Sequence, residues 1–218
     1  MRVPPLLDSP DPTLLAAIAP DAWQTLVEGV RPAAMLVAID SRLGERLRAE
    51  LDAEDIWQDT LLHAWKARMT HRWCGLRQFR RWLLQIAENR IRNAADHFDA
   101  ACRGGGVQHL TLGPGADASG RGTDASRFEP AVTATPSREA GRRELAAAMA
   151  GALGELDAEL RDVVRLRLVE DASTAEVAAA LGLGESAVKH RLRKGIEHYT
   201  RVLRRRLPDA VPRPAPAG

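Results

Sequence analysis

The sequence predicts an all-α protein built of two small helical domains joined by a flexible linker. Only 4% of the 218 residues are aromatic, Ala, Leu and Arg are abundant, and β-branched runs are short. Apolar residues recur at helical spacing in two stretches, 21–98 and 138–207. Between them, residues 99–137 hold seven Gly and three Pro with little periodicity, a composition typical of a tether between domains. Residues 1–20 and 208–218 are predicted to be disordered tails.

The first domain is predicted to be a helical bundle. Helical periodicity begins at Asp21, is interrupted or restarted at Pro32, and continues to Leu51. A second helix is expected over 54–69, and Gly75 breaks the pattern before a third over 79–97. The apolar stripes of these segments contain Trp23, Leu26, Met35, Leu36, Ile39, Ile56, Leu61, Trp65, Phe79, Trp82, Leu83, Ile86 and Ile91.

The second domain ends in a predicted helix-turn-helix over 173–194. Ser173 is a good N-cap, and Glu176 three residues later completes a capping box. Gly182 stands where the first helix must stop and the chain turn sharply, a position that favours a residue able to take positive φ. Two earlier helices are expected, one carrying Leu145 and Leu153 and one capped by Asp157.

The second helix of this motif, from about Glu185, presents a cationic face. If Val188 and Leu192 point inward, the outward residues are Ser186, Lys189, His190, Arg193 and Lys194. Such a face suits the major groove of DNA, although an αα-hairpin with a solvated basic face would show the same pattern.

Charge is segregated along the chain, although the formal net charge is only +2. Residues 40–62 and 144–171 each contain seven acidic residues and three Arg, whereas 70–97 and 184–207 contain six and eight basic residues against two acidic ones. Alternating blocks of this kind indicate two kinds of partner, one of them polyanionic.

Other functional classes find little support. The two cysteines, Cys74 and Cys102, make no disulfide framework, and their spacing argues against a zinc site with His71 and His109. No metal, cofactor or catalytic constellation is expected. No apolar run approaches membrane-spanning length and no signal peptide is evident, so a cytoplasmic protein is expected.

Four motifs in series resemble the sigma-70 family of RNA polymerase sigma factors. AEDIWQDTLLHAW over 53–65 and FRRWLLQIAEN over 79–89 resemble helices of its second region, and LDAELRDVVRLR over 156–167 and the helix-turn-helix over 170–192 resemble its fourth. Two such domains without further regions are similar to the small extracytoplasmic-function type. The resemblance implies a non-enzymatic specificity subunit whose partners are core RNA polymerase and promoter DNA, as duplex and as melted strand. It leaves open an anti-sigma factor as a further partner.

The resemblance also implies site residues. The outer face of 54–69 would dock on core polymerase through Asp55, Gln58, Asp59 and Leu62. The proximal promoter element and its melted strand would be bound by Trp73, Arg77, Arg80, Arg81, Asn89, Arg90, Arg92 and Asn93. The distal element would be read by Ser186, Lys189, His190 and Arg193, with Arg191 and Lys194 on phosphates. Trp73 is equally well explained as a core residue, and the acidic helix face as merely solvated.

Two other functions remain open at this point. A stand-alone helix-turn-helix regulator, with an N-terminal dimerisation or sensing domain, would bind a symmetric operator without polymerase. An antagonist that mimics a sigma surface would bind protein partners without DNA. The Trp65 and Trp82 motifs weigh against the first and the basic 70–97 segment against the second.

Overall fold

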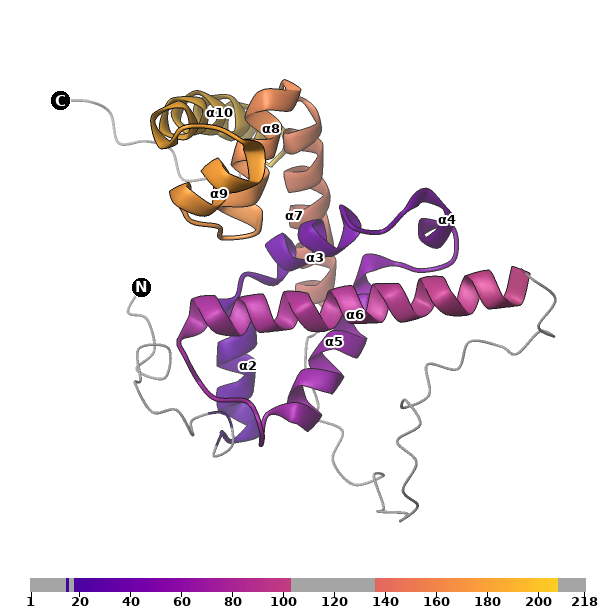
Figure 1. Ribbon diagram of the computed structural model, residues 1–218. Coiled ribbons are helices and arrows are strands. Elements are labelled where there is room, and N and C mark those ends of the chain that lie inside the picture. Colours follow the sequence, from indigo (N-terminus) through magenta and orange to yellow (C-terminus); the bar gives the residue numbers. More distant parts are fainter. Residues whose placement is uncertain (1–14, 16–17, 103–135, 208–218) are drawn as a thin grey trace, which may run out of the picture.

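The computed structural model describes residues 15, 18–102 and 136–207, and every regular element in them is helical, which confirms the all-α class. Figure 1 shows the arrangement. The helices are α2 (Pro20–Gly29), α3 (Pro32–Asp40), α4 (Glu45–Arg48), α5 (Ala53–Ala67), α6 (Leu76–Cys102), α7 (Pro136–Gly154), α8 (Ala158–Val164), the π-helical turn η2 (Arg165–Val169), α9 (Thr174–Leu181) and α10 (Glu185–Arg206). We refer to α2–α6 as module one and to α7–α10 as module two.

Module one is organised around an aromatic core. The Trp23 ring, 2% exposed, makes edge contacts with Trp65 and Phe79 at centroid distances of 5.3 and 5.7 Å. Aromatic pairs in this geometry add stabilisation beyond the area they bury. Local signals set the helix starts: Pro20 and Pro32 occupy first-turn positions, and Asp52 caps α5 in a capping box with Asp55.

The limits of module one differ from the expected ones at both ends. Leu15 and Ile18, which fall in the predicted N-terminal tail, are buried in its core at 0% and 7% exposure. Helix α6 runs on to Cys102, into the predicted linker, and α7 begins at Pro136. The rest of the linker and tails lies outside the described residues.

Module two contains the predicted helix-turn-helix. Ser173 and Glu176 form the expected capping box at the start of α9, and Gly182 ends that helix with φ of +64°. Val163 of α8 packs with Val177 and Val188 in a small separate core. At Gly195 the backbone of α10 approaches α8 so closely that an added Cβ would lie 2.5 Å from Val164 Cγ2.

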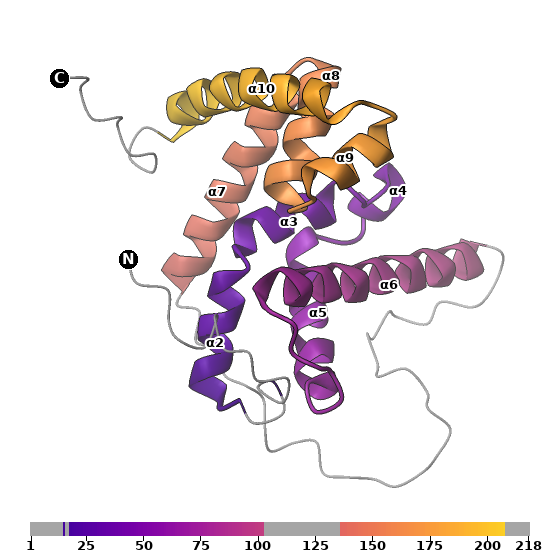
Figure 2. The ribbon, with the colours of Figure 1, turned by 60° about the vertical axis from the view of Figure 1, so that its left-hand side comes forward.

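The two modules pack directly on each other. Helix α7 lies along α3, and one apolar cluster includes residues of both, such as Leu36 and Ile39 with Ala146 and Leu153. In the turned view α9 lies above α3 (Figure 2), and η2 contacts both α3 and α9. The start of α9 meets the start of α6, where Arg77 binds Glu176. The sequence alone leaves open whether the two modules lie apart or pack on each other. In the structure they pack on each other, an arrangement that we call closed.

Candidate nucleic-acid interface

The distal recognition face lies on the N-terminal half of α10. Its predicted residues Ser186, Lys189, His190, Arg193 and Lys194 are all exposed. Val188, on the opposite side of the helix, is fully buried against α8 and α9, and this fixes the rotation of α10. The helix therefore presents cations and hydrogen-bonding groups on a free face, the arrangement that a major groove accepts.

Arg191 differs from its neighbours on α10. Its guanidinium is half-buried and forms an ion pair with Glu159 of α8, with Nη2–Oε2 at 2.8 Å. The pair links the recognition helix α10 to α8 within module two. A phosphate contact by Arg191 would have to share the guanidinium with that carboxylate.

The proximal face, predicted on α6, is partly occupied by module two. Arg77 donates to the Glu176 carboxylate at 2.7 Å and to the Asp171 carbonyl at 3.2 Å. Arg81 donates to the other oxygen of Glu176. The carboxylate is therefore clasped by two guanidinium groups, and the Arg81 hydrogen bond, with the Ser173 backbone N–H, lowers the pKa of Glu176 to about 2.

Arg80 is the most enclosed of these cations. Its side chain is buried between the modules and donates to the carbonyls of Val30 in module one and Val169 in module two. Burial lowers the pKa of Arg80 to about 10, which still leaves it charged at neutral pH. In this arrangement Arg80 cannot reach a phosphate.

Farther along α6 the predicted residues are open. Asn89, Arg92 and Asn93 are exposed, and Arg92 donates to the Asn89 side chain at 3.2 Å. Arg90 instead turns toward α5 and pairs with Asp59, with Nε–Oδ2 at 3.4 Å. Of the eight predicted proximal residues, Asn89, Arg92 and Asn93 are therefore exposed on α6 with no polar contact to module two within the described residues, whereas Arg77, Arg80 and Arg81 contact module two and Arg90 contacts α5.

Of the two explanations open for Trp73 in the loop before α6, the structure has the core residue. Trp73 is 3% exposed and packs at 5.8 Å from Phe79, so its ring is part of the core. The ring that reaches solvent here is His71, which stacks flat on Trp82 with centroids 3.8 Å apart and planes at 9°. Burial lowers the pKa of His71, which favours a neutral, stackable ring. Nothing in the sequence pattern distinguished His71, because the stack depends on how the loop folds back.

The predicted polymerase-binding face of α5 is mostly open. Asp55, Gln58 and Leu62 are exposed, and Met69 beyond the helix end adds a second exposed apolar side chain. Asp59 is different: its carboxylate, 10% exposed, holds His63 and Arg90 at 3.2 and 3.4 Å. Asp59 therefore joins α5 to α6.

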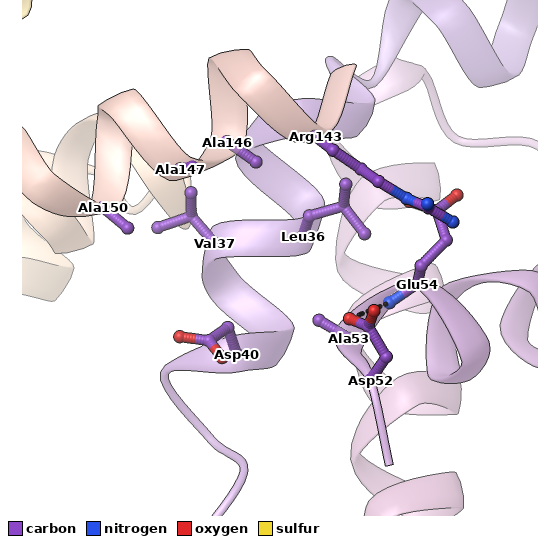
Figure 3. A pocket seen from close by; sticks show the side chains of 10 residues that line it. All are labelled: Leu36, Val37, Asp40, Asp52, Ala53, Glu54, Arg143, Ala146, Ala147 and Ala150. Atoms are coloured by element: carbon purple, nitrogen blue, oxygen red, sulfur yellow. Dashed lines mark hydrogen bonds and ion pairs between the residues drawn. The ribbon is translucent and has the colours of Figure 1, made fainter. Parts of the chain in front are cut away.

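A cavity of about 280 Å³ lies where α7 meets α3 and the start of α5 (Figure 3). Arg143 reaches across it toward Glu54, whose carboxylate is 3.8 Å from both Arg142 and Arg143. Glu54 is only 3% exposed, and this burial outweighs the two cations, so its pKa is raised. The cavity is also lined by Leu36, Val37, Asp40, Asp52, Ala53, Ala146, Ala147 and Ala150.

Within the described residues, no group of three or more His, Cys, Asp or Glu side chains could hold a metal ion. Cys74 is exposed as a free thiol, and His109 lies outside those residues. In the same part of the chain no helix has the length and apolar character that crossing a membrane requires.

Comparison with known proteins gives consistent matches. The family model "Sigma-70 region 2" matches residues 34–97, and "Sigma-70, region 4" matches residues 146–198. The ECF RNA polymerase sigma factor SigG of Mycobacterium tuberculosis is 36% identical over 155 residues, which cover 66% of this chain and 40% of SigG. RNA polymerase sigma factor CnrH of Cupriavidus metallidurans is 32% identical over 148 residues, covering 66% of this chain and 69% of CnrH.

Two solved structures were also matched. CnrH in complex with the cytosolic domain of CnrY is 27% identical, with 88% of this chain and 96% of that chain covered and a TM-score of 0.35. The RsbN-BldN complex is 22% identical, with 84% and 91% covered and a TM-score of 0.27.

Proposed function

The chain belongs to the sigma-70 family, in its extracytoplasmic-function group, and from this premise we propose that it is a dissociable specificity subunit of bacterial RNA polymerase. It would direct the core enzyme to promoters and assist melting of the DNA, with no catalytic step of its own. Because the chain spans only 40% of the length of SigG, this activity and its partners are our proposal for the chain.

The observation that carries the proposal is the pairing of two regions in series. Residues 34–97 match region 2 and residues 146–198 match region 4, so one chain holds a basic α6 face and an exposed recognition face on α10. Two DNA-facing modules on one chain can engage two elements of the same promoter, and joining them raises the effective concentration of the second.

The roles of the two modules follow from their surfaces. Ser186, Lys189, His190 and Arg193 would read base edges of the distal duplex, and Lys194 and Arg191 would hold phosphates. The cations of α6, with Asn89 and Asn93, would hold the proximal element and its melted strand. Core polymerase would bind the open face of α5 at Asp55, Gln58 and Leu62, with Asp59 supporting that face from within.

The proposed setting is the cytoplasm, where polymerase and promoters are found. An anti-sigma factor is a further proposed partner, on the family relationship alone.

In-vitro transcription tests the proposal. Core RNA polymerase without a sigma subunit is mixed with the chain and fragmented genomic DNA from its source, and transcripts are sequenced from their 5′ ends. We expect discrete start sites that share a two-part upstream motif. Failure to initiate, together with tight binding of the chain alone to a palindromic duplex, would instead indicate a stand-alone regulator.

Binding to core polymerase is tested separately with a double variant, Gln58→Ala/Leu62→Ala. Both side chains are exposed, so the fold should be kept while affinity for the core enzyme falls. Glu144→Ala, an exposed position on α7, is the control and should bind as the unchanged chain does. Equal binding by all three proteins would reject the α5 face as the docking surface.

A further inference from the structure

The cavity between α7, α3 and the start of α5 combines a charged end with apolar walls (Figure 3). Glu54 and Arg143 lie together at the charged end, while Leu36 and Val37 of α3 face alanine side chains of α7 along the rest. An apolar cavity of about 150 Å³ can already admit a benzene ring. The 280 Å³ found here therefore has room for a short apolar side chain together with charged groups.

The carboxylate of Glu54 is buried in this cavity without a close donor. Its Oε2 atom accepts no hydrogen bond from the described residues. The distances from its two oxygens to Arg142 Nη2 and Arg143 Nε are both 3.8 Å, longer than the roughly 2.7–3.2 Å of a hydrogen bond. A buried acceptor that lacks a donor costs free energy, and a donor placed in the cavity would recover it.

The other carboxylates of the cavity already have partners. Asp40 pairs with Arg48, with Oδ1–Nε at 3.4 Å, and Asp52 accepts the Glu54 backbone N–H at 3.3 Å as the cap of α5. Arg143, in contrast, has 58% of its side chain exposed and approaches Glu54 no closer than 3.8 Å. The charged end therefore offers one acceptor, on Glu54, and one fork of donors, on Arg143.

These groups select the kind of molecule that fits. A simple cation would pair with Glu54 but would lie against Arg143, and a simple anion would meet the opposite conflict. A purely apolar molecule would leave the Glu54 carboxylate without a donor. A zwitterion satisfies both charged groups, because its ammonium can donate to Glu54 while its carboxylate accepts from the guanidinium fork of Arg143. An apolar side chain on that zwitterion would pack against Leu36 and Val37.

We propose that this cavity binds a free α-amino acid with an apolar side chain of about the size of leucine, its ammonium on Glu54 and its carboxylate on Arg143. The three small side chains Ala146, Ala147 and Ala150 on α7 leave the room that the ligand's side chain needs.

A ligand in this place contacts both modules, because α3 and α5 belong to module one and α7 to module two. Binding would therefore stabilise the packing of α7 on α3 in proportion to ligand concentration. The site involves neither the recognition face of α10 nor the cations of α6. Amino-acid binding and the sigma-factor role can consequently fail independently of each other.

The test titrates the full chain at neutral pH with four matched probes. L-leucine carries all three recognised features, 3-methylbutylamine lacks only the carboxylate, 4-methylpentanoate lacks only the ammonium, and glycine lacks the side chain. Binding is followed by NMR of a chain with ¹³C-labelled alanine methyl groups. The methyls of Ala146, Ala147 and Ala150 line the cavity, and those of Ala179 and Ala180, exposed on α9, are internal controls.

We expect L-leucine to shift the cavity methyls with a Kd of roughly 0.1–1 mM, the range open to a ligand of its size. The amine and the acid should each bind about tenfold or more weakly, because each leaves one charged group of the cavity unpaired. Glycine should cause no shift at concentrations that saturate L-leucine binding, because it gains nothing from the apolar walls.

Three variants of the chain identify the anchors. Glu54→Gln and Arg143→Gln should each weaken L-leucine binding about tenfold or more. Arg143→Gln should also remove the advantage of L-leucine over 3-methylbutylamine. Glu144→Gln, which removes the same charge at an exposed position of α7, should bind as the unchanged chain does. Circular dichroism checks helical content, and the exposed position of Arg143 keeps the test valid even where Glu54→Gln fails to fold.

Any of three results would overturn the inference. The cavity methyls could stay unshifted by L-leucine up to about 20 mM, as a cavity that holds only water would. The amine or the acid could bind as tightly as L-leucine, or a folded Glu54→Gln or Arg143→Gln chain could keep full affinity. A chain that binds L-leucine but never directs core polymerase to promoters would keep this site and lose the proposed function.

Discussion

Two basic helix faces of this chain are predicted to bind DNA, and they lie in opposite surroundings. The face of α10 around Arg193 is exposed along its whole length. The N-terminal face of α6 is engaged by module two: Arg80 is buried, and Arg77 and Arg81, with 45% and 38% of their side chains exposed, are bound to Glu176. The two faces are similar in composition, so the difference comes from what packs against them.

The comparison shows what a helical pattern can and cannot establish about a binding face. Periodicity identifies which side chains point away from the core of their own module, because that depends on neighbours three and four residues away. Whether a second module then covers that side depends on contacts between residues almost 100 positions apart, such as Arg77 and Glu176.

The largest expected effect is on the stability of module one, whose aromatic core lies beneath α6. Trp23→Ala empties the aromatic core beneath α6, where the ring contacts Trp65 and Phe79. We expect a loss of about 3–5 kcal/mol in the free energy of unfolding, measured by urea denaturation. The neighbouring Gln24→Ala, which removes only a surface hydrogen bond to Glu28, should cost less than about 0.5 kcal/mol.

The next largest effect is on DNA binding by the exposed face of α10. Arg193→Ala should change which distal sequences are bound, at about 1–3 kcal/mol for the base pair it reads, because it removes a base-edge contact. Lys194→Ala should weaken binding to all sequences alike and flatten its salt dependence, because it removes a phosphate contact. Binding of both variants to a library of duplexes at two salt concentrations distinguishes these outcomes. Equal changes in sequence preference would show that the base-edge role of Arg193 and the phosphate role of Lys194 are wrongly assigned.

A smaller effect separates the two roles of Glu176, which is part of the α9 capping box and also binds Arg77 and Arg81 of α6. Ser173→Ala removes the acceptor for the Glu176 backbone N–H, and the loss of an N-cap should destabilise α9 by about 1 kcal/mol. The clasp by Arg77 and Arg81 remains, so the radius of gyration should not change. Ser173→Asn should restore the cap. An expansion of Ser173→Ala as large as that of Glu176→Gln would mean that capping of α9 and packing of the two modules are one interaction.

The smallest effect is a dependence on pH. Hydrogen bonding to Arg81 and Ser173 lowers the pKa of Glu176 from 4.5 to about 2. The Arg81 hydrogen bond exists only in the closed form, so its contribution favours closure above the ordinary pKa of Glu176 and is lost as the pH falls from 4.5 toward 2. The radius of gyration should therefore rise as the pH falls from about 4.5 toward 2, and rise less in Glu176→Gln. Identical curves, at unchanged helicity, would contradict the assignment.

Much of the fold could be predicted from local sequence. The Ser173–Glu176 capping box and the positive φ of Gly182 are confirmed in the structure, because a cap and a turn involve only residues a few positions apart. The exposure of the recognition residues follows in the same way, once Val188 is buried. The all-α class is confirmed as well.

The sites on α5 and α6 could be predicted only in part, for a physical reason. Asp59 lies on the polar side of its helix, yet its carboxylate is held by Arg90 from α6. Trp73 stands in a polar loop, yet it is buried against Phe79. Both outcomes depend on how separate helices pack, which no periodicity within one helix encodes. Whether these residues contact polymerase or DNA stays a prediction.

The π-helical turn η2 has a consequence for the length of the chain. The backbone N–H groups just after it reach five and six residues back, from Glu170 to Arg165 and from Ala172 to Leu166, so the turn holds one residue more than an α-helical turn would. Because the extra residue is taken up within one turn, an in-frame deletion of one codon in 165–169 would let the turn close as an ordinary α-helical turn, and Val163 and Glu170 would keep their orientation relative to each other. Loss of a single residue here should therefore disturb the contacts of Glu170 and the helix-turn-helix core less than loss of one residue from α8.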